Sequence, residues 1–255
     1  MYVNFPRPPN REHQIFSKFL RFIGARLTPG GQFGLHLTTG VMMMVITVSI
    51  FGNLASEVME QDDLTVLDLH IANWFNANHF EPMTSIMMAI TTVHMMPGVI
   101  LMASAFGLYL WKRGQVYWIW ALLLSVPVGM LLNVLLKYTF QRSRPVFEEP
   151  LVTLATYSFP SGHASAATLF YGLVACYVMI ARKGWSVRLG TAAACAMMIL
   201  LVAFSRVYLG AHYLSDVLAG MAGSAAWLTI CITAISTLRR RREAKSLSND
   251  SGGML

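Results

Sequence analysis

The chain has 255 residues, of which 55% are hydrophobic and only 12% are charged. Soluble domains carry about 25% charged residues, so the composition excludes an ordinary soluble protein and predicts an integral membrane protein of one domain. The net charge of +7 does not indicate a nucleic-acid partner, because the basic residues gather in the segments between apolar stretches, as they do in membrane proteins.

Six apolar stretches follow a basic N-terminal segment. About 20 apolar residues in a helix cross a bilayer core of about 30 Å, and six stretches reach that length. We predict an all-α, polytopic membrane bundle with six transmembrane helices plus short interfacial helices. Segment 1–33 is expected to be a basic, amphipathic, cytoplasmic segment, 34–238 the six-span domain, and 239–255 a basic, then disordered, cytoplasmic tail. The predicted spans are 34–54, 84–110, 116–136, 161–181, 189–208 and 216–238.

The basic residues predict the orientation of the chain. All but four of the 19 lie in segments that the spans would place on one side, which should be the cytoplasmic side and should hold both termini. The four exceptions share the outer side with most of the acidic residues. They are Lys137, Arg142, Arg144 and Arg206. Charges near the bilayer core are costly, so these four need a reason.

The first outer loop contains a weakly amphipathic segment, for which we expect a helix lying on the outer surface. The apolar residues at helical spacing are Leu64, Leu67, Ile71, Trp74 and Phe75. In the second span, Pro97-Gly98 predicts a kink.

The first outer cluster runs from Lys137 to Pro145, after the third span. Pro145 disfavours helical geometry at Arg144, so the chain turns and both Lys137 and Arg144 can face inward. Taken alone, these cations could also be side chains that extend to the membrane interface. Arg142, between them, is expected to contact the interface or a substrate.

The second cluster is Pro160-Ser161-Gly162-His163, where a polar loop meets the fourth span. Proline is favoured in the first turn of a helix, and Ser161 and Gly162 would then leave free N–H groups at a positive helix end, which binds phosphate well. His163 adds a group that can give or take a proton near neutral pH. A simple helix cap is the alternative.

The third cluster is Ser205-Arg206, followed by His212 and Asp216. His212 and Asp216 are four residues apart, so on a helix they share a face. A carboxylate there can hold one imidazole nitrogen and leave the other free to attack. An interfacial histidine beside an aspartate at a helix start is the alternative.

The three clusters fall on the same side of the membrane, each at a helix end. Together they supply cations, a helix N-terminus, two histidines and a carboxylate, which are the parts that phosphoryl transfer needs. In this order, Lys-x6-Arg-Pro, Pro-Ser-Gly-His and Ser-Arg-x5-His-x3-Asp resemble the signature motifs of the type 2 phosphatidic acid phosphatase superfamily. That superfamily also includes soluble bacterial acid phosphatases and vanadium haloperoxidases. Every motif position matches.

The resemblance implies a metal-independent mechanism through a phosphohistidine, without a cofactor. His212 would be the nucleophile, oriented by Asp216, and His163 would protonate the leaving group. The residues implied to bind the phosphate are Lys137, Arg144, Ser161, Gly162 and Arg206. The residue spacing by itself favours His212 but leaves open which histidine attacks. No histidine pair has metal-ligand spacing, so we expect no metal site.

The expected activity is hydrolysis of a lipid phosphate monoester or diphosphate from the outer leaflet. The lipids considered are undecaprenyl diphosphate, phosphatidylglycerophosphate, phosphatidic acid and lipid A 1-phosphate. The compact six-span form with short loops predicts a bacterial inner membrane protein with its site facing the periplasm, whose partners are this substrate and the membrane lipids.

Two other functions stay open. One is a lipid phosphotransferase that uses the same phosphohistidine. The other is a non-catalytic lipid-phosphate carrier, which is disfavoured because binding alone does not need the His212–Asp216 pair or His163. A haloperoxidase is also disfavoured, because its chemistry does not need a six-span membrane body.

Overall fold

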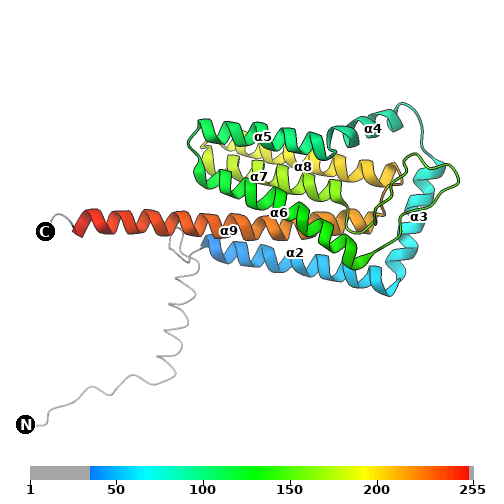
Figure 1. Ribbon diagram of the computed structural model, residues 1–255, viewed down its shortest axis with the longest axis horizontal. Helices are drawn as coiled ribbons and strands as arrows, with labels where there is room; N and C mark the ends of the chain where they lie inside the picture. Colours follow the sequence, from blue (N-terminus) through cyan, green and yellow to red (C-terminus); the bar gives the residue numbers. More distant parts are fainter. Residues whose placement is uncertain (1–34, 253–255) are drawn as a thin grey trace, which may run out of the picture.

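The computed structural model describes residues 35–252, with side chains described for 35–242. The described residues form a bundle of helices without a β-strand (Figure 1). The predicted N-terminal segment 1–33 lies outside them. The helices are α2 (Leu35–Glu60), α3 (Asp63–Ala77), α4 (Met83–Val93), α5 (Met96–Lys112), α6 (Val116–Phe140), α7 (Gly162–Ala181), α8 (Trp185–Tyr208) and α9 (Leu214–Gly252).

The bundle confirms the all-α membrane architecture. Five helices (α2, α6, α7, α8 and α9) are each long and apolar enough to cross a membrane. α4 and α5 pass the same test together and make a sixth span if they are counted as one. Each predicted span therefore has a helical counterpart, although the helices extend beyond most of the predicted limits.

The second predicted span is formed by α4 and α5 and is broken where these helices meet, at a bend of 56°. α4 ends at Val93, and α5 begins at Met96 with Pro97 in its first turn, a position where proline's missing N–H is not needed. The expected kink at Pro97-Gly98 thus lies just before these residues. Gly98 permits the sharp bend, because a Cβ atom there would lie 1.9 Å from the carbonyl oxygen of Val93.

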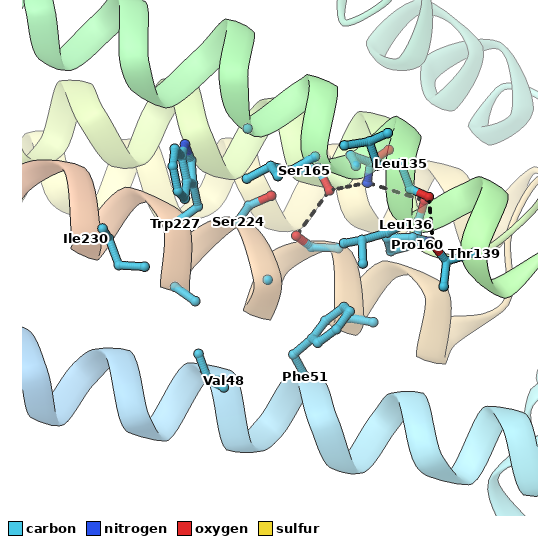
Figure 2. A pocket seen from close by; sticks show the side chains of 17 residues that line it. Val48, Phe51, Leu135, Leu136, Thr139, Pro160, Ser165, Ser224, Trp227 and Ile230 are labelled. Atoms are coloured by element: carbon cyan, nitrogen blue, oxygen red, sulfur yellow. Dashed lines mark hydrogen bonds between the residues drawn. The ribbon is translucent and has the colours of Figure 1, made fainter.

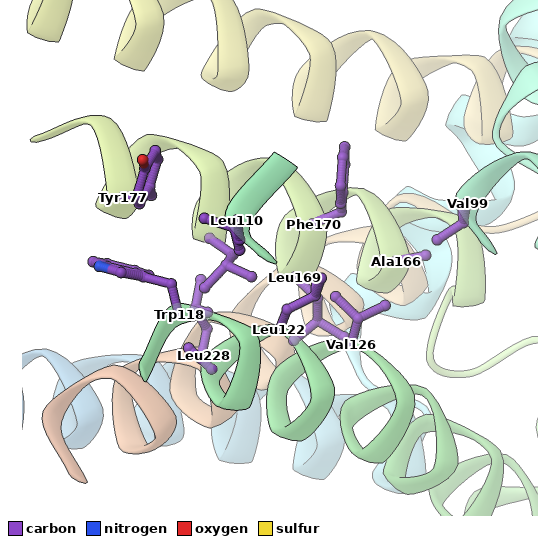
Figure 3. Packing of buried hydrophobic residues seen from close by; sticks show 12 residues of the cluster. Val99, Leu110, Trp118, Leu122, Val126, Ala166, Leu169, Phe170, Tyr177 and Leu228 are labelled. Carbon is purple, nitrogen blue, oxygen red and sulfur yellow. The ribbon is translucent and has the colours of Figure 1, made fainter. Parts of the chain in front are cut away.

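α7 is the most buried of the candidate spans and packs against α6, α8 and α9 (Figure 1). Its Leu169 and Leu173 lie in a core with Leu122 of α6 and Leu228 of α9 (Figure 3). Close packing of this kind makes interiors resistant to local displacement. It therefore holds the N-terminal end of α7, where the second cluster lies, in a fixed position.

α3 lies across one end of the bundle (Figure 1). The expected helix is present, but only some of its apolar residues at helical spacing are covered by the bundle. Ile71 and Phe75 pack against the cluster formed by α7, α8 and α9, whereas Trp74 is 59% exposed and Asp68 is buried. A carboxylate therefore points from α3 into the bundle, and its charge is compensated there as described below.

Within residues 35–242, the basic residues of the predicted cytoplasmic segments lie at the opposite end of the bundle. Lys112 ends α5 there, and the arginine run 239–242 lies far along α9 (Figure 1). The backbone of α9 continues as a helix to Gly252, where the sequence predicts a disordered tail after Lys245. Arginine, glutamate, alanine and lysine in 239–245 are all good helix formers, which explains why the helix does not end with the apolar residues.

Candidate active site

The three clusters meet at the end of the bundle that α3 covers. The N-terminal ends of α7 and α9, the C-terminal end of α8 and the segment 141–161 come together there (Figure 1). The site is thus formed by helix ends that the packed cores hold in place.

His212 and Asp216 lie at the centre of this site, and both side chains are buried. Nδ1 of His212 lies 3.5 Å from Oδ2 of Asp216. Ser158 donates a hydrogen bond to the same carboxylate oxygen, and its hydroxyl lies 3.4 Å from His212 Nδ1. The main-chain N–H of Tyr213 also donates to this oxygen, over 2.9 Å. The carboxylate is therefore fixed, and it occupies the Nδ1 side of the imidazole.

The other nitrogen of His212 faces a cation. Nε2 lies 3.2 Å from Nη1 of Arg144, whose Nε donates to the carbonyl oxygen of Thr156 over 2.6 Å. Lys137 reaches the same segment from α6 and donates to the carbonyl oxygen of Tyr157 over 2.8 Å. The structure therefore brings both predicted cations of the first cluster inward, beside the second cluster and the histidine.

The start of α7 differs from the expectation at two points. Pro160 precedes the N-cap residue, so it lies outside the first turn of the helix where it was expected. Ser161 is the N-cap residue, but its N–H is not free, because it donates to the main-chain carbonyl oxygen of Asp216 over 2.9 Å. α7 and α9 approach so closely at this point that a Cβ atom at Gly220 would lie 2.7 Å from the Ser161 carbonyl oxygen. The N–H groups of Gly162 and His163 lie in the first turn, where a helix offers no carbonyl partner.

Three buried polar atoms of the predicted site have no hydrogen-bond partner among the described residues: Ser161 Oγ, His163 Nε2 and Arg206 Nε. Buried polar groups are normally paired. An anion with several acceptor oxygens would accept from the hydroxyl and the guanidinium, and also from the imidazole when Nε2 carries a proton. Their presence together therefore favours a phosphate-binding site.

Arg206 has a partner on the broken span. The side chain is only 2% exposed, and its Nη1 donates to the hydroxyl of Thr91 on α4. The sequence showed Thr91 only as a polar residue within an apolar span. Its role in holding a cation of the site depends on the packing of α4 against α8, which no local pattern indicates.

Arg142 lies beside two carboxylates of the site. It forms ion pairs with Asp216 (Nη1 to Oδ1, 2.6 Å) and with Asp68 of α3 (Nη2 to Oδ2, 2.9 Å). Its guanidinium also lies over the ring of Tyr213, 4.4 Å from the centroid. The sequence analysis expected an interface or substrate contact for Arg142 and did not predict these two carboxylate partners. Asp68, Ser158 and Thr91 are the site residues that sequence reasoning missed.

Burial controls the charge of His212. Burial lowers the pKa of His212 from 6.5 to about 3, although Asp216 opposes the change, and Arg144 and Arg206 add to it. The imidazole is therefore neutral at neutral pH, as a nucleophile requires. Burial would also lower the pKa of Arg142, but the adjacent carboxylates, first Asp216 and then Asp68, raise it above its ordinary value.

An apolar cavity of about 300 Å³ borders the site. It lies between α2, α6 and α9, and its wall includes Phe51 of α2 and Ser224 and Trp227 of α9 (Figure 2). Pro160 and Ser165, which flank the start of α7, form part of its wall. An apolar chain in this cavity would therefore end close to the phosphate-binding groups.

The fold is that of a polytopic membrane protein, and the buried cations and histidines at one end of the bundle, with the polar atoms left unpaired among the described residues, suit phosphoryl transfer. Residues 118–240 match the family model described as the PAP2 superfamily. The chain is 33% identical over 149 residues to phosphatidylglycerophosphatase B of Bacillus subtilis (strain 168), and the match covers 58% of this chain and 68% of that protein. The chain belongs to the PAP2 superfamily.

Other comparisons agree with this assignment. An undecaprenyl-diphosphatase of Sulfolobus acidocaldarius is 34% identical over 104 residues, which cover 39% of this chain and 46% of that protein. The crystal structure of a transmembrane PAP2 type phosphatidylglycerolphosphate phosphatase from Bacillus subtilis superposes with a TM-score of 0.62 at 25% identity, covering 74% of this chain and 93% of that one.

The crystal structure of Aquifex aeolicus LpxE superposes with a TM-score of 0.52 at 19% identity, covering 65% of this chain and 94% of that one. At that identity the similarity concerns the fold alone. Family membership confirms the resemblance found in the motifs, and it confirms the expected class of enzyme, a membrane phosphatase.

Proposed function

We propose that this protein is a metal-independent lipid phosphatase that acts through a phosphohistidine. The observation that carries the proposal is the placement of His212, which is neutral, with Nδ1 at the carboxylate of Asp216 and Nε2 facing Arg144. An imidazole held in this way presents one nitrogen for attack while a carboxylate stabilises the charge that develops on the ring.

The reaction has two steps. In the first, Nε2 of His212 attacks phosphorus, the bond from phosphorus to the leaving oxygen breaks, and His163 gives its proton to that oxygen. In the second, water attacks the phosphohistidine, His163 takes a proton from the water, and inorganic phosphate leaves as His212 is regenerated. His163 suits this role because its Nε2 is buried next to the phosphate site without another partner among the described residues.

The phosphate oxygens are held by side chains and by the start of α7. Lys137, Arg144 and Arg206 supply positive charge, and Ser161 and the N–H of Gly162 supply neutral donors. Donors fixed before the reaction stabilise the charge that forms in the transition state. They also supply the positive charge that a metal ion provides in other phosphatases.

The substrate class follows from the apolar cavity beside the start of α7. A cavity lined by Phe51, Leu136 and Trp227 favours an acyl or isoprenoid chain rather than a soluble sugar or nucleotide. We propose a phosphate monoester or diphosphate of a lipid. The names of the two relatives favour phosphatidylglycerophosphate and undecaprenyl diphosphate, and phosphatidic acid and lipid A 1-phosphate share the required chemistry.

The proposed location is the inner membrane of a bacterium, with both termini in the cytoplasm and the site at the periplasmic face. The support is the distribution of basic residues, because most of those within 35–242 lie at the end of the bundle opposite the site (Figure 1). A reporter that is active only in the periplasm should work when fused after Glu149 and fail when fused after Lys183. The reverse pattern would overturn the orientation.

The test of function is release of inorganic phosphate by the purified protein from a panel of the four lipids, with excess EDTA in parallel. We expect hydrolysis of at least one lipid, unaffected by EDTA and inhibited by vanadate, which occupies phosphate sites. Transfer of phosphate to an added acceptor lipid instead of water would indicate a phosphotransferase. Binding of a lipid phosphate without turnover would indicate a carrier.

A further inference from the structure

Asp68 reaches the site from outside the three motif clusters. It lies in α3, is only 1% exposed, and is 74 residues from its ion-pair partner Arg142 in the chain. Its Oδ1 accepts a hydrogen bond from the N–H of Ser215 over 3.0 Å, and its Oδ2 accepts from Arg142 over 2.9 Å and from the hydroxyl of Ser215. Both carboxylate oxygens are therefore occupied by donors of the site.

Arg142 joins this carboxylate to Asp216. One terminal nitrogen, Nη1, contacts Oδ1 of Asp216 at 2.6 Å and the hydroxyl of Ser215 at 2.7 Å, and the other, Nη2, contacts Asp68. The planar guanidinium suits such bridging, because its donors point in fixed directions. The two oxygens of Asp216 are thereby divided: Oδ1 faces Arg142, and Oδ2 faces His212, Ser158 and Tyr213.

The net charge of Asp68, Arg142 and Asp216 favours the imidazolium that forms on His212 during the reaction. Two carboxylates surround one guanidinium, so Asp68, Arg142 and Asp216 together carry one net negative charge. If Asp216 were alone with Arg142, the guanidinium would neutralise the carboxylate that must stabilise the imidazolium of His212. Asp68 offsets the charge of Arg142, so the charge of Asp216 remains available on the side that faces the histidine. In a buried site, where screening is weak, such a difference is large.

We propose that Asp68 and Arg142 are positioning residues for the reaction, acting on His212 through Asp216. Arg142 fixes the orientation of the carboxylate, and Asp68 keeps Arg142 from neutralising it. The inference rests on the proposed function of His212 and Asp216. It extends the machinery of the site to α3, an element that precedes all three motifs in the chain.

The competing explanation is that the Asp68–Arg142 pair only attaches α3 to the bundle. A structural pair of this kind would change the amount and the thermal stability of folded protein, but the folded fraction would react normally. A positioning pair instead lowers kcat and slows formation of the phosphohistidine, while KM stays close to the original value because neither residue binds the phosphate.

The experiment compares Asp68→Asn with wild type and with Asp63→Asn, which removes the same charge from an exposed position of the same helix. For folded Asp68→Asn protein, we expect kcat to fall by about 10-fold or more, the scale of one to two buried charge contacts. KM should change less than threefold, and rapid-quench trapping should show a matching loss in the rate of phosphoenzyme formation. Asp63→Asn should behave like wild type.

Two further variants sharpen the test. Arg142→Gln should reduce kcat at least as much as Asp68→Asn, and Arg142→Lys should recover part of the loss because one bond to a carboxylate remains. In the double variant Asp68→Asn/Arg142→Gln the losses should be less than additive, since the net charge beside His212 is again that of one carboxylate.

The outcomes separate this inference from the proposed function. If wild type releases phosphate and Asp68→Asn has normal kcat and a normal rate of phosphoenzyme formation, the positioning role is refuted. A loss of thermal stability with unchanged kcat per folded molecule also refutes it and leaves a structural pair. If wild type has no activity on any lipid phosphate, the proposed function itself fails.

Discussion

The main-chain N–H of Ser161 donates a hydrogen bond to the main-chain carbonyl oxygen of Asp216, with the two atoms 2.9 Å apart. The start of α7 carries the proposed phosphate-binding groups, and the start of α9 carries the carboxylate that orients His212. This hydrogen bond therefore connects the phosphate-binding end of α7 directly to the end of α9 that carries Asp216. Their separation depends on how closely two helix ends pack, and that in turn depends on Gly220.

The first prediction concerns this close approach. Gly220→Ala places a Cβ atom 2.7 Å from the Ser161 carbonyl oxygen, so the start of α7 must move away from α9. A displacement near 1 Å in a catalytic site can cost about 100-fold, and we expect kcat/KM to fall by about 10- to 100-fold. Gly223→Ala is the control, because its Cβ would meet the ring of Phe51 at 3.2 Å, a side chain that can rotate. Equal activity of the two variants would contradict the prediction.

The second prediction concerns the support of Arg206 by α4. Thr91→Val keeps the shape of the side chain but removes the hydroxyl that accepts from Arg206. A hydrogen bond to a charged group contributes about 1.5–3 kcal/mol, so we expect inhibition by vanadate to weaken by roughly 10-fold or more. Thr91→Ser should retain most of the affinity. Thr92→Val, at an exposed neighbouring position, should have no effect, and a similar loss there would argue against a specific role for Thr91.

The third prediction concerns pH and stability. The pKa of His212 is about 3 in the folded protein and 6.5 ordinarily, so between these values the unfolded chain binds one more proton. Stability from this group is therefore present above pH 6.5 and falls as the pH is lowered toward 3, by about 1.4 kcal/mol per pH unit within that interval. His212→Gln should flatten the decline of thermal stability with falling pH, measured in detergent between pH 4 and 8.

A control for this measurement is Leu209→Ala, which removes a buried side chain next to the same turn. It should lower stability by a similar amount at every pH and leave the slope unchanged, because no titrating group is removed. If His212→Gln has the slope of wild type, protonation of His212 is not the source of the acid sensitivity.

Hydrophobic length and charge placement predicted most of the fold. Each expected span has a helical counterpart, because a long apolar segment in a bilayer has few alternatives to a helix. The break between α4 and α5 was displaced, since Pro97 is tolerated in the first turn of a new helix and the chain bends before it. The helix α3 was predicted, but periodicity could not show that Asp68 would be buried, because its cationic partner Arg142 lies in another part of the chain.

The site was predictable where chemistry is local and not where it depends on packing. His212 and Asp216 are four residues apart and lie in contact as predicted, although His212 lies in the turn before α9 and not on the same helix as Asp216. The contacts of Arg142 with Asp68 and of Arg206 with Thr91 join residues 74 and 115 positions apart. No spacing rule relates such pairs, so a single sequence offered an interface or substrate contact for Arg142 and left Thr91 without a role.

The last prediction concerns the division of work between the two histidines. His212→Ala should abolish turnover and prevent any covalent intermediate, because the atom that attacks phosphorus is lost. His163→Ala should lose the general acid, which is typically worth about 10²–10⁴-fold. That loss should shrink for an aryl phosphate, because a good leaving group departs without a proton. Asp216→Asn should reduce the rate by orders of magnitude with either substrate, because the orientation of His212 and the charge that stabilises its imidazolium are both weakened.

The measurement compares both histidine variants on a natural lipid phosphate and on an aryl phosphate, with acid-labile phosphoenzyme trapped by rapid quench. His163→Ala should still form phosphoenzyme from the aryl substrate, because Nε2 of His212 keeps its place beside Arg144, and the intermediate should accumulate because His163 no longer assists the attacking water. His212→Ala should form none from either substrate. If the aryl substrate restored activity to His212→Ala and not to His163→Ala, the two roles would be reversed, and the contact between His212 and Asp216 would serve the acid rather than the nucleophile.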